Sequence, residues 1–260
     1  MKRVDTQCLG APLTGYLHDT SGEIDRASRP TVIICPGGGY EFLSDRENEP
    51  PAMVLFSRGY QVFVLEYAVG AAASDMRPLE QLSRAVALVR ERAAAWHVDP
   101  NAVAVMGFSA GGHLAASLGV HWADQRVAQA GSGRNRPDAM VLCYPVIVAG
   151  RFAHQKSFDL VTGGDKSLED FFSLERHVSP DTPPAFIWHT ADDEVVPMQN
   201  SLWMAAALGQ AGVACELHIF EKGQHGLSLC NQEVGTPNPD CAAWVDMCVH
   251  FLNRRFHFVP

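Results

Sequence analysis

The stretch that most constrains the fold is residues 102–114, AVAVMGFSAGGHL. Its first five residues are apolar and have the length of a buried strand. Gly107 and Gly111 then stand two residues before and two residues after Ser109, with Gly112 behind them. Glycine on both sides of the serine indicates a sharp turn from strand to helix, because side chains would not fit where the two elements cross. Ser109 would stand at the tip of this turn.

Strand-like and helix-like patterns alternate along the rest of the chain. Apolar runs that predict strands lie at 31–35, 61–67, 139–144, 185–189 and 215–220, and helices are expected at 50–58, 79–90 and 240–254. Near-continuous apolar strands that alternate with amphipathic helices are typical of a parallel sheet covered on both faces. We therefore expect one α/β domain over 1–260, with a mostly parallel central sheet and helices on both of its faces.

One segment departs from this alternation of strands and helices. Residues 146–184 separate two predicted strands by more than one helix needs. Connections of this length usually serve a function or contain small elements of their own. We expect a small cap insertion over the site.

Composition excludes several partners. A formal net charge of −9 argues against nucleic acid or an anionic membrane as the main partner. The first residues lack the apolar stretch of a signal peptide, and no run approaches the roughly 18 apolar residues of a membrane span. The seven cysteines are scattered and form no CxxC pair, which favours buried free thiols. These features predict a cytoplasmic protein that does not bind membranes.

The turn at Ser109 predicts a nucleophile, and a serine nucleophile needs a base and an orienting acid. In this type of fold the chain order is serine, acid, histidine. His225 follows a predicted strand in a loop with glycine on both sides, where a mobile imidazole belongs, whereas His189 precedes the candidate acids. The residue pattern leaves both Asp192 and Asp193 open as the acid.

Two segments could supply backbone donors to a developing oxyanion. The N–H of Ala110, directly after the serine, is the first candidate. The second is the run 36–40, PGGGY, in which Gly38 and Gly39 let the backbone turn its amides toward the charge. A phosphate-binding loop is the rival interpretation, but neither GxxxxGK[ST] nor GxGxxG is present at this point.

Four stretches together resemble the α/β-hydrolase superfamily, and within it the small acetyl esterases and acetylxylan-esterase-like carbohydrate esterases. They are CPGGGY at 35–40, GFSAGGHLAA at 107–116, HTADDEVVP at 189–197 and FEKGQHG at 220–226. In the family pattern HGxxDxxVP, the acid falls on Asp193. Two positions depart from the common patterns: Pro36 replaces the histidine of HGGG, and Thr190 replaces the glycine after His189.

The resemblance implies a two-step acyl transfer. Ser109 would attack the ester after His225 takes its proton, and Asp193 would orient His225. The amides of Gly38, Gly39 and Ala110 would hold the oxyanion. The resemblance implies no metal or cofactor, and similar esterases are often dimers, so a homodimer is one expectation.

The substrate is predicted less directly. Tyr40, Glu41, Tyr144 and Trp188 lie near strand ends, where they would line a substrate pocket. The sequence shows no hydrophobic lid helix, so we expect short acyl esters rather than long-chain lipids as substrates. The specific hypothesis is that the substrates carry acetyl groups on small sugars or xylo-oligosaccharides. An amide-cleaving hydrolase, such as a peptidase or a formamidase-like enzyme, is the alternative. A third hypothesis is a non-catalytic binding protein of the same fold.

Overall fold

The computed structural model describes residues 1–24, 26–235 and 237–260. Within these residues eight strands form one sheet, in the order β1-β2-β4-β3-β5-β6-β7-β8. The strands are β1 Lys2–Cys8, β2 Ala11–Leu17, β3 Arg29–Cys35, β4 Gln61–Leu65, β5 Val98–Phe108, β6 Ala139–Cys143, β7 Ala185–Thr190 and β8 Cys215–Phe220. Strands β3 to β8 run parallel to one another, whereas β1 and β2 form an antiparallel hairpin whose second strand pairs antiparallel with β4.

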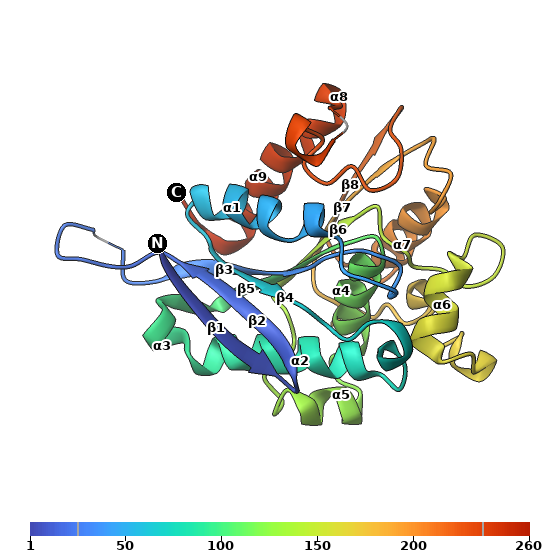
Figure 1. Ribbon diagram of the computed structural model, residues 1–260, viewed down its shortest axis with the longest axis horizontal. Coiled ribbons are helices and arrows are strands. Elements are labelled where there is room, and N and C mark those ends of the chain that lie inside the picture. The colour runs from blue at the N-terminus through green and yellow to red at the C-terminus, as the bar shows by residue number, and fades with distance from the viewer. Residues whose placement is uncertain (25, 236) are drawn as a thin grey trace.

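Helices cover both faces of this sheet (Figure 1). Over the described residues they are α1 Glu49–Ser57, α2 Arg77–Glu91, α3 Ala93–Trp96, α4 Ala110–His121, α5 Gln125–Ala130, α6 Gln155–Thr162, α7 Gln199–Gln210, α8 Pro239–Ala242 and α9 Trp244–Phe256. Helices α1 and α9 pack on one face, and α2, α4 and α7 pack on the other. The predicted mostly parallel sheet with helices on both faces is confirmed.

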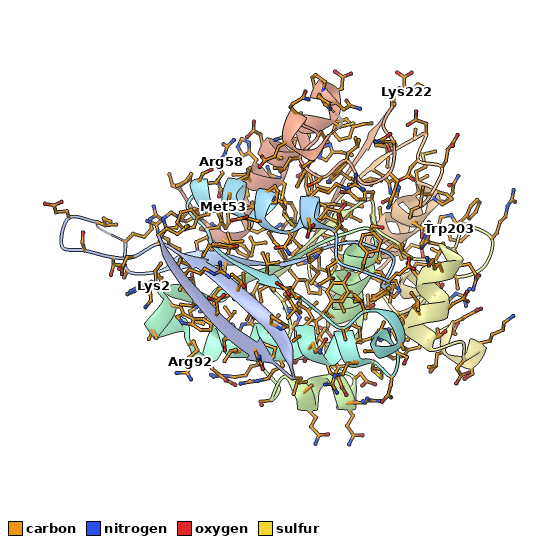
Figure 2. All side chains as sticks on the ribbon, viewed as in Figure 1. Lys2, Met53, Arg58, Arg92, Trp203 and Lys222 are labelled. Atoms are coloured by element: carbon orange, nitrogen blue, oxygen red, sulfur yellow. The ribbon has the colours of Figure 1, made fainter. Side chains whose placement is uncertain are left out.

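The central strand β5 shows why the sequence of these strands is apolar without interruption. Successive side chains of a strand point to opposite faces. Val103 and Val105 belong to the core under α2 and α4, whereas Ala104 and Met106 belong to the core under α1 and α9. All four are fully buried. Charged side chains such as Lys2, Arg58 and Lys222 instead lie on the outside of these layers (Figure 2).

Three features differ from the sequence prediction or extend it. The N-terminal hairpin of β1 and β2 was not predicted, because Lys2–Cys8 is an exposed edge strand in which only Val4 and Cys8 are apolar. The helix expected over 240–254 is divided into α8 and α9 at Ala243. Residues 146–184 contain α6 and two short 3₁₀ turns. Their role as a cap stays a prediction.

The parallel strands place four loops at one edge. The carboxyl ends of β3, β5, β7 and β8 lie at the same edge of the sheet, because these strands point in one direction. Ligands of open α/β sheets bind outside this edge. The loops that follow these strands contain the glycine run 36–40, Ser109, Asp193 and His225.

Candidate active site

Ser109 lies at the turn between β5 and α4, with a backbone conformation that non-glycine residues rarely adopt (φ 53°, ψ −118°). Its carbonyl and N–H are held by Val146 N and Cys143 O. A Cβ atom at Gly107 would lie 1.9 Å from Gly111 O, and one at Gly111 would lie 2.0 Å from Cys35 O. The turn therefore requires glycine at both positions, as the sequence predicted.

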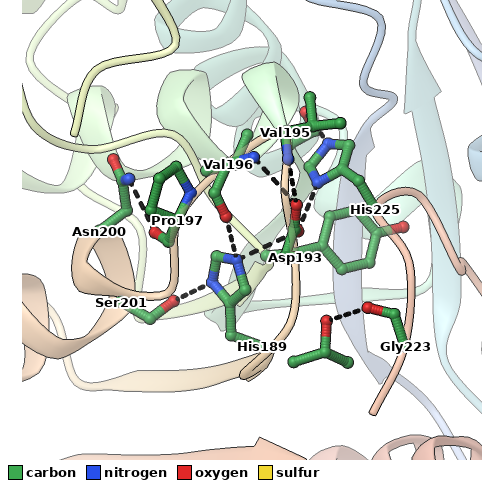
Figure 3. A network of polar contacts seen from close by, with 12 residues as sticks. His189, Asp193, Val195, Val196, Pro197, Asn200, Ser201, Gly223 and His225 are labelled. Carbon is green, nitrogen blue, oxygen red and sulfur yellow. Dashed lines mark hydrogen bonds and ion pairs between the residues drawn. The ribbon is translucent and has the colours of Figure 1, made fainter.

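His225 lies in the loop after β8, between Ser109 and Asp193. Its Nε2 is 2.8 Å from Ser109 Oγ. Its Nδ1 is 2.6 Å from Asp193 Oδ2 (Figure 3). A carboxylate only accepts hydrogen bonds, so Nδ1–H donates to Asp193, and Nε2 is left to accept the hydroxyl proton of Ser109. The structure thus brings together the three residues predicted as nucleophile, base and acid, in the order that proton transfer needs.

Asp193 is held on all sides. Its Oδ1 accepts from the N–H groups of Val195 and Val196, each at 2.9 Å, and its Oδ2 faces both His225 and His189 (Figure 3). Burial alone raises the pKa of a carboxyl, but the hydrogen bonds from His189 and His225 outweigh it and hold the pKa of Asp193 well below its usual range. Asp193 is therefore ionised at neutral pH.

The neighbouring Asp192 has a different role. Its carboxylate accepts from Gly223 N at 2.7 Å and lies 3.8 Å from Lys222 Nζ. Both partners belong to the loop that carries His225. Asp192 therefore fixes the backbone of that loop, and the carboxylate that contacts the imidazole is Asp193.

The glycine run after β3 borders the same site. Gly38 (φ 121°) and Gly39 (φ 65°) both adopt conformations that favour glycine. A Cβ atom at Gly38 would lie 2.1 Å from Phe42 O, so the loop also needs glycine for its close internal packing. Ala110 is the first residue of α4, where the helix presents free N–H groups and the positive end of its dipole. Their role as oxyanion donors stays a prediction.

These groups open onto a cavity of about 260 Å³. Its lining comes from the loops after β3, β5, β7 and β8 and from the start of α6: Gly38, Gly39, Glu41, Phe42, Ser44, Arg46, Glu47, Ser109, His154, Lys156, Val195, His225 and Gly226. Lys156, from α6, pairs with Glu41 across the cavity. Burial lowers the pKa of His154, and the charges of His225 and Lys156 lower it further, so its imidazole is neutral at neutral pH.

Of the four expected pocket residues, Glu41 lines this cavity and the other three lie beneath it. The Tyr40 hydroxyl bonds to His113 Nδ1 in one core. Tyr144 and Trp188 belong to the opposite core, where Trp188 stacks on Trp244. Both tyrosines have positive φ (61° and 37°), which turns their side chains from the loop into the layer below. The expectation that Tyr40, Tyr144 and Trp188 line the pocket is corrected accordingly.

A family model described as BD-FAE matches residues 21–208, which include most of the sheet, Ser109 and Asp193. The chain belongs to the BD-FAE family. The predicted α/β-hydrolase fold and the resemblance to acetylxylan-esterase-like proteins are both confirmed. Proteins that this chain resembles are named as an acetylxylan esterase and as a carboxylesterase.

Three relatives illustrate the likeness of this BD-FAE chain to known proteins. Endo-1,4-beta-xylanase B of Butyrivibrio fibrisolvens is 38% identical over 85% of the chain and 35% of its own length. Acetylxylan esterase of Xylanibacter ruminicola is 31% identical over 79% of the chain and 42% of its own length. The crystal structure of an acetyl ester-xyloside bifunctional hydrolase from Caldicellulosiruptor lactoaceticus is 38% identical, covers 96% of the chain and 89% of that structure, and superposes with a TM-score of 0.84. The chain thus spans less than half the length of the two curated relatives.

Several lining residues of the BD-FAE chain were not predicted from the sequence. They are Phe42, Ser44, Arg46, Glu47, His154, Lys156, Val195 and Gly226. Nothing in the pattern of 41–47 marks Phe42, Arg46 or Glu47, since charged residues there also fit a solvated surface loop. The available indication was position: 41–47 follows the strand β3 at the edge where ligands bind.

Two further observations bear on partners. Nowhere in the described part of the chain do three or more His, Cys, Asp or Glu side chains gather as a metal site would require. The helices of the described residues are also too short or too polar to span a bilayer.

Proposed function

We propose that this protein is a serine-dependent carboxylic ester hydrolase that removes short acyl groups, acetyl above all, from small sugars or xylo-oligosaccharides. The observation that carries the proposal is the chain of hydrogen bonds from Ser109 Oγ through His225 to the buried Asp193, which opens onto a small cavity. The names of two relatives, an acetylxylan esterase and an acetyl ester-xyloside hydrolase, support acetylated sugars as the substrate class.

The proposed reaction has two steps. His225 Nε2 takes the Ser109 proton as Oγ attacks the ester carbonyl, and the protonated imidazole then gives that proton to the departing alcohol. Asp193, ionised and hydrogen-bonded to Nδ1–H, stabilises the positive imidazolium. A water molecule, deprotonated by the same imidazole, then releases the acid from Ser109.

The oxyanion of each tetrahedral intermediate would be held by the amides of Gly38, Gly39 and Ala110. Gly38 and Gly39 line the same cavity as Ser109, and Ala110 directly follows it, which supports this proposal. Backbone donors of this kind need no reorganisation as the charge forms. One such donor contributes about 3 to 4 kcal/mol in comparable sites.

The test is hydrolysis of p-nitrophenyl acetate, butyrate and octanoate and of acetylated xylo-oligosaccharide by wild type and Ser109→Ala. We expect acetate release from both acetyl substrates, a falling rate with longer chains, and a loss of about 10³-fold or more in the variant. Equal rates for the two proteins would overturn the proposal. Activity on the synthetic esters alone would support the esterase activity but contradict acetylated sugars as the substrate.

Matched amide substrates separate the amide-cleaving alternative from the esterase, and covalent labelling of Ser109 by a fluorophosphonate separates both from a binding protein. Faster cleavage of the amide than of its ester would favour the alternative. The cytoplasmic location and the homodimer remain predictions from the sequence.

A further inference from the structure

Glu47 is a buried carboxylate that the proposed mechanism does not use. It ends the short 3₁₀ turn η1 (Asp45–Glu47) and is 2% exposed. Both of its oxygens accept hydrogen bonds from neutral donors, Oε2 from Gly37 N at 2.8 Å and Oε1 from the Tyr144 hydroxyl at 2.7 Å. Burial of a carboxylate is unfavourable for stability, and burial raises the pKa of Glu47 even though these hydrogen bonds oppose it.

The first contact of Glu47 reaches the glycine run. Gly37 directly precedes Gly38 and Gly39, the proposed oxyanion donors. A Cβ atom at Gly37 would lie 2.5 Å from Glu47 Oε2 and 3.0 Å from Ser109 Cβ. The backbone of Gly37 is thus held between the carboxylate and the serine, and its hydrogen bond to Oε2 sets how far the run lies from Ser109.

The second contact reaches the loop of His225. The Tyr144 hydroxyl donates to Glu47 and accepts from Ser228 N at 2.8 Å, three residues beyond His225. The Tyr144 ring also packs edge-on against the His225 imidazole, with the ring centroids 5.1 Å apart. Ser228 Oγ in turn donates to Arg46 O. The turn η1 and the loop after β8 are therefore joined both through Tyr144 and directly.

We infer that Glu47 is a positioning residue of the active site: through Gly37 N–H and the Tyr144 hydroxyl it fixes the oxyanion loop and the His225 loop relative to each other. The inference rests on the proposed esterase function. Both side-chain oxygens of Glu47 accept a hydrogen bond, so this one residue satisfies both donors at once. Misplacement of catalytic groups by as little as 1 Å can lower the rate about 100-fold.

The test compares Glu47→Gln with Tyr144→Phe, using p-nitrophenyl acetate as substrate. The amide of Glu47→Gln has one acceptor oxygen, so it can satisfy only one of the two donors. We expect kcat to fall roughly 10- to 100-fold with KM within about 2-fold of wild type, because the groups fixed by Glu47 act in the transition state. Tyr144→Phe removes the second contact alone and is expected to lower kcat in the same direction.

The matched control is Glu49→Gln, two residues away at the exposed start of α1. It removes the same charge without touching the site, and we expect wild-type kcat. Double substitution at 47 and 144 should lower kcat by less than the product of the single effects, because both act through one network.

A second readout is independent of activity. In the amide NMR spectrum, the Gly37 proton should lie downfield in wild type, where it bonds to a carboxylate, and should move upfield in Glu47→Gln. Melting temperatures show whether each variant is folded. If Glu47→Gln does not fold, Tyr144→Phe alone carries the kinetic test.

The outcomes separate this inference from the function on which it rests. Wild-type kcat in Glu47→Gln or in a folded Tyr144→Phe, with an inactive Ser109→Ala, overturns the role of Glu47 alone. An unchanged Gly37 amide shift in a folded Glu47→Gln does the same. Equal rates for wild type and Ser109→Ala overturn the esterase and, with it, the positioning role.

Discussion

His189 Nε2 lies 3.3 Å from Asp193 Oδ2, so the carboxylate that orients His225 has a second imidazole on its other side. His189 is fully buried at the end of β7, four residues before Asp193 (Figure 3). Its Nε2–H also donates to Val196 O at 2.8 Å, which leaves Nδ1 to accept from the Ser201 hydroxyl. The His189 imidazole therefore stabilises the charge of Asp193 and the loop that carries it.

Replacement of His189 should impair both stability and rate. In His189→Leu the Ser201 hydroxyl and the Val196 carbonyl lose their buried partner, at a cost of about 1–3 kcal/mol each. We expect a lower midpoint in urea unfolding and a fall in kcat of about 10- to 100-fold as Asp193 loses its support. A variant with wild-type kcat would show that His189 only fills the core. Gel filtration and circular dichroism establish that the variant is folded.

Asp193→Asn tests the acid itself and its linkage to pH. The variant keeps the shape but favours the wrong tautomer of His225, so kcat should fall by about 10³- to 10⁴-fold. Because the pKa of Asp193 is depressed in the folded state, its ionised form stabilises the protein above the ordinary aspartate pKa of about 3.9. That contribution is lost as the pH falls below this value.

The stability difference between wild type and Asp193→Asn should therefore be largest near pH 7 and should shrink below about pH 4. Urea unfolding of both proteins at several pH values measures it, and other carboxylates cancel in the difference. Asp192→Asn is the matched control. A full loss of activity in Asp192→Asn with activity retained in Asp193→Asn would reverse the assignment of the acid.

The turn at Ser109 was the part of the site that the sequence could specify most fully. Gly107 and Gly111 were predicted to be required by the crossing of strand and helix, and the structure gives the reason as a contact of 2 Å or less between any Cβ at either position and a backbone carbonyl. The turn is predictable because the glycines that shape it lie within two residues of Ser109 in the sequence. The same holds for the positions of the parallel strands along the chain, which the apolar runs predicted.

Side-chain direction at strand ends could not be predicted in this way. Tyr144 and Trp188 were expected in the pocket because they lie near the carboxyl ends of the parallel strands, where the site is. Both side chains instead point into the core. Tyr144 directly follows β6 and has a φ of 37°, which a sequence pattern does not reveal. Trp188 lies within β7, where its side chain joins the core under α1 and α9. Glu47 was missed for a related reason, since its burial depends on donors 10 and 97 positions away in the chain.

Two glycine substitutions should change stability in opposite directions. In Gly111→Ala the new Cβ would lie 2.0 Å from Cys35 O and 2.4 Å from Pro36 O, so strand β3 or the helix must shift. We expect a loss of 3 kcal/mol or more, on the order of the largest overpacking effects. Gly209, in the last turn of α7, has no atom within 4 Å of such a Cβ. Gly209→Ala should stabilise the protein by about 0.5–1 kcal/mol.

Urea unfolding of both glycine variants checks these values, and ester hydrolysis gives a second measure. Gly209→Ala should retain wild-type kcat because the residue is remote from the cavity. A folded and active Gly111→Ala would contradict the packing found at the turn.

Phe42 offers a test of the sugar substrate. Phe42 is 57% exposed and lines the cavity beside Ser109, so its ring is accessible to a ligand in that cavity. The apolar face of a sugar ring would pack on such an aromatic side chain, whereas an acetyl group alone is too small to reach across it.

In Phe42→Ala we expect KM for acetylated xylo-oligosaccharide to rise about 10-fold, equivalent to about 1.4 kcal/mol of binding, with kcat for p-nitrophenyl acetate nearly unchanged. Trp203→Ala is the matched control, because Trp203 is a half-exposed aromatic residue on α7 that does not line the cavity (Figure 2). Equal effects of Phe42→Ala on the sugar and on the synthetic ester would place Phe42 in acyl binding. No effect on either substrate would show that Phe42 does not bind the sugar. The proposed acyl transfer at Ser109 would be unaffected by that result.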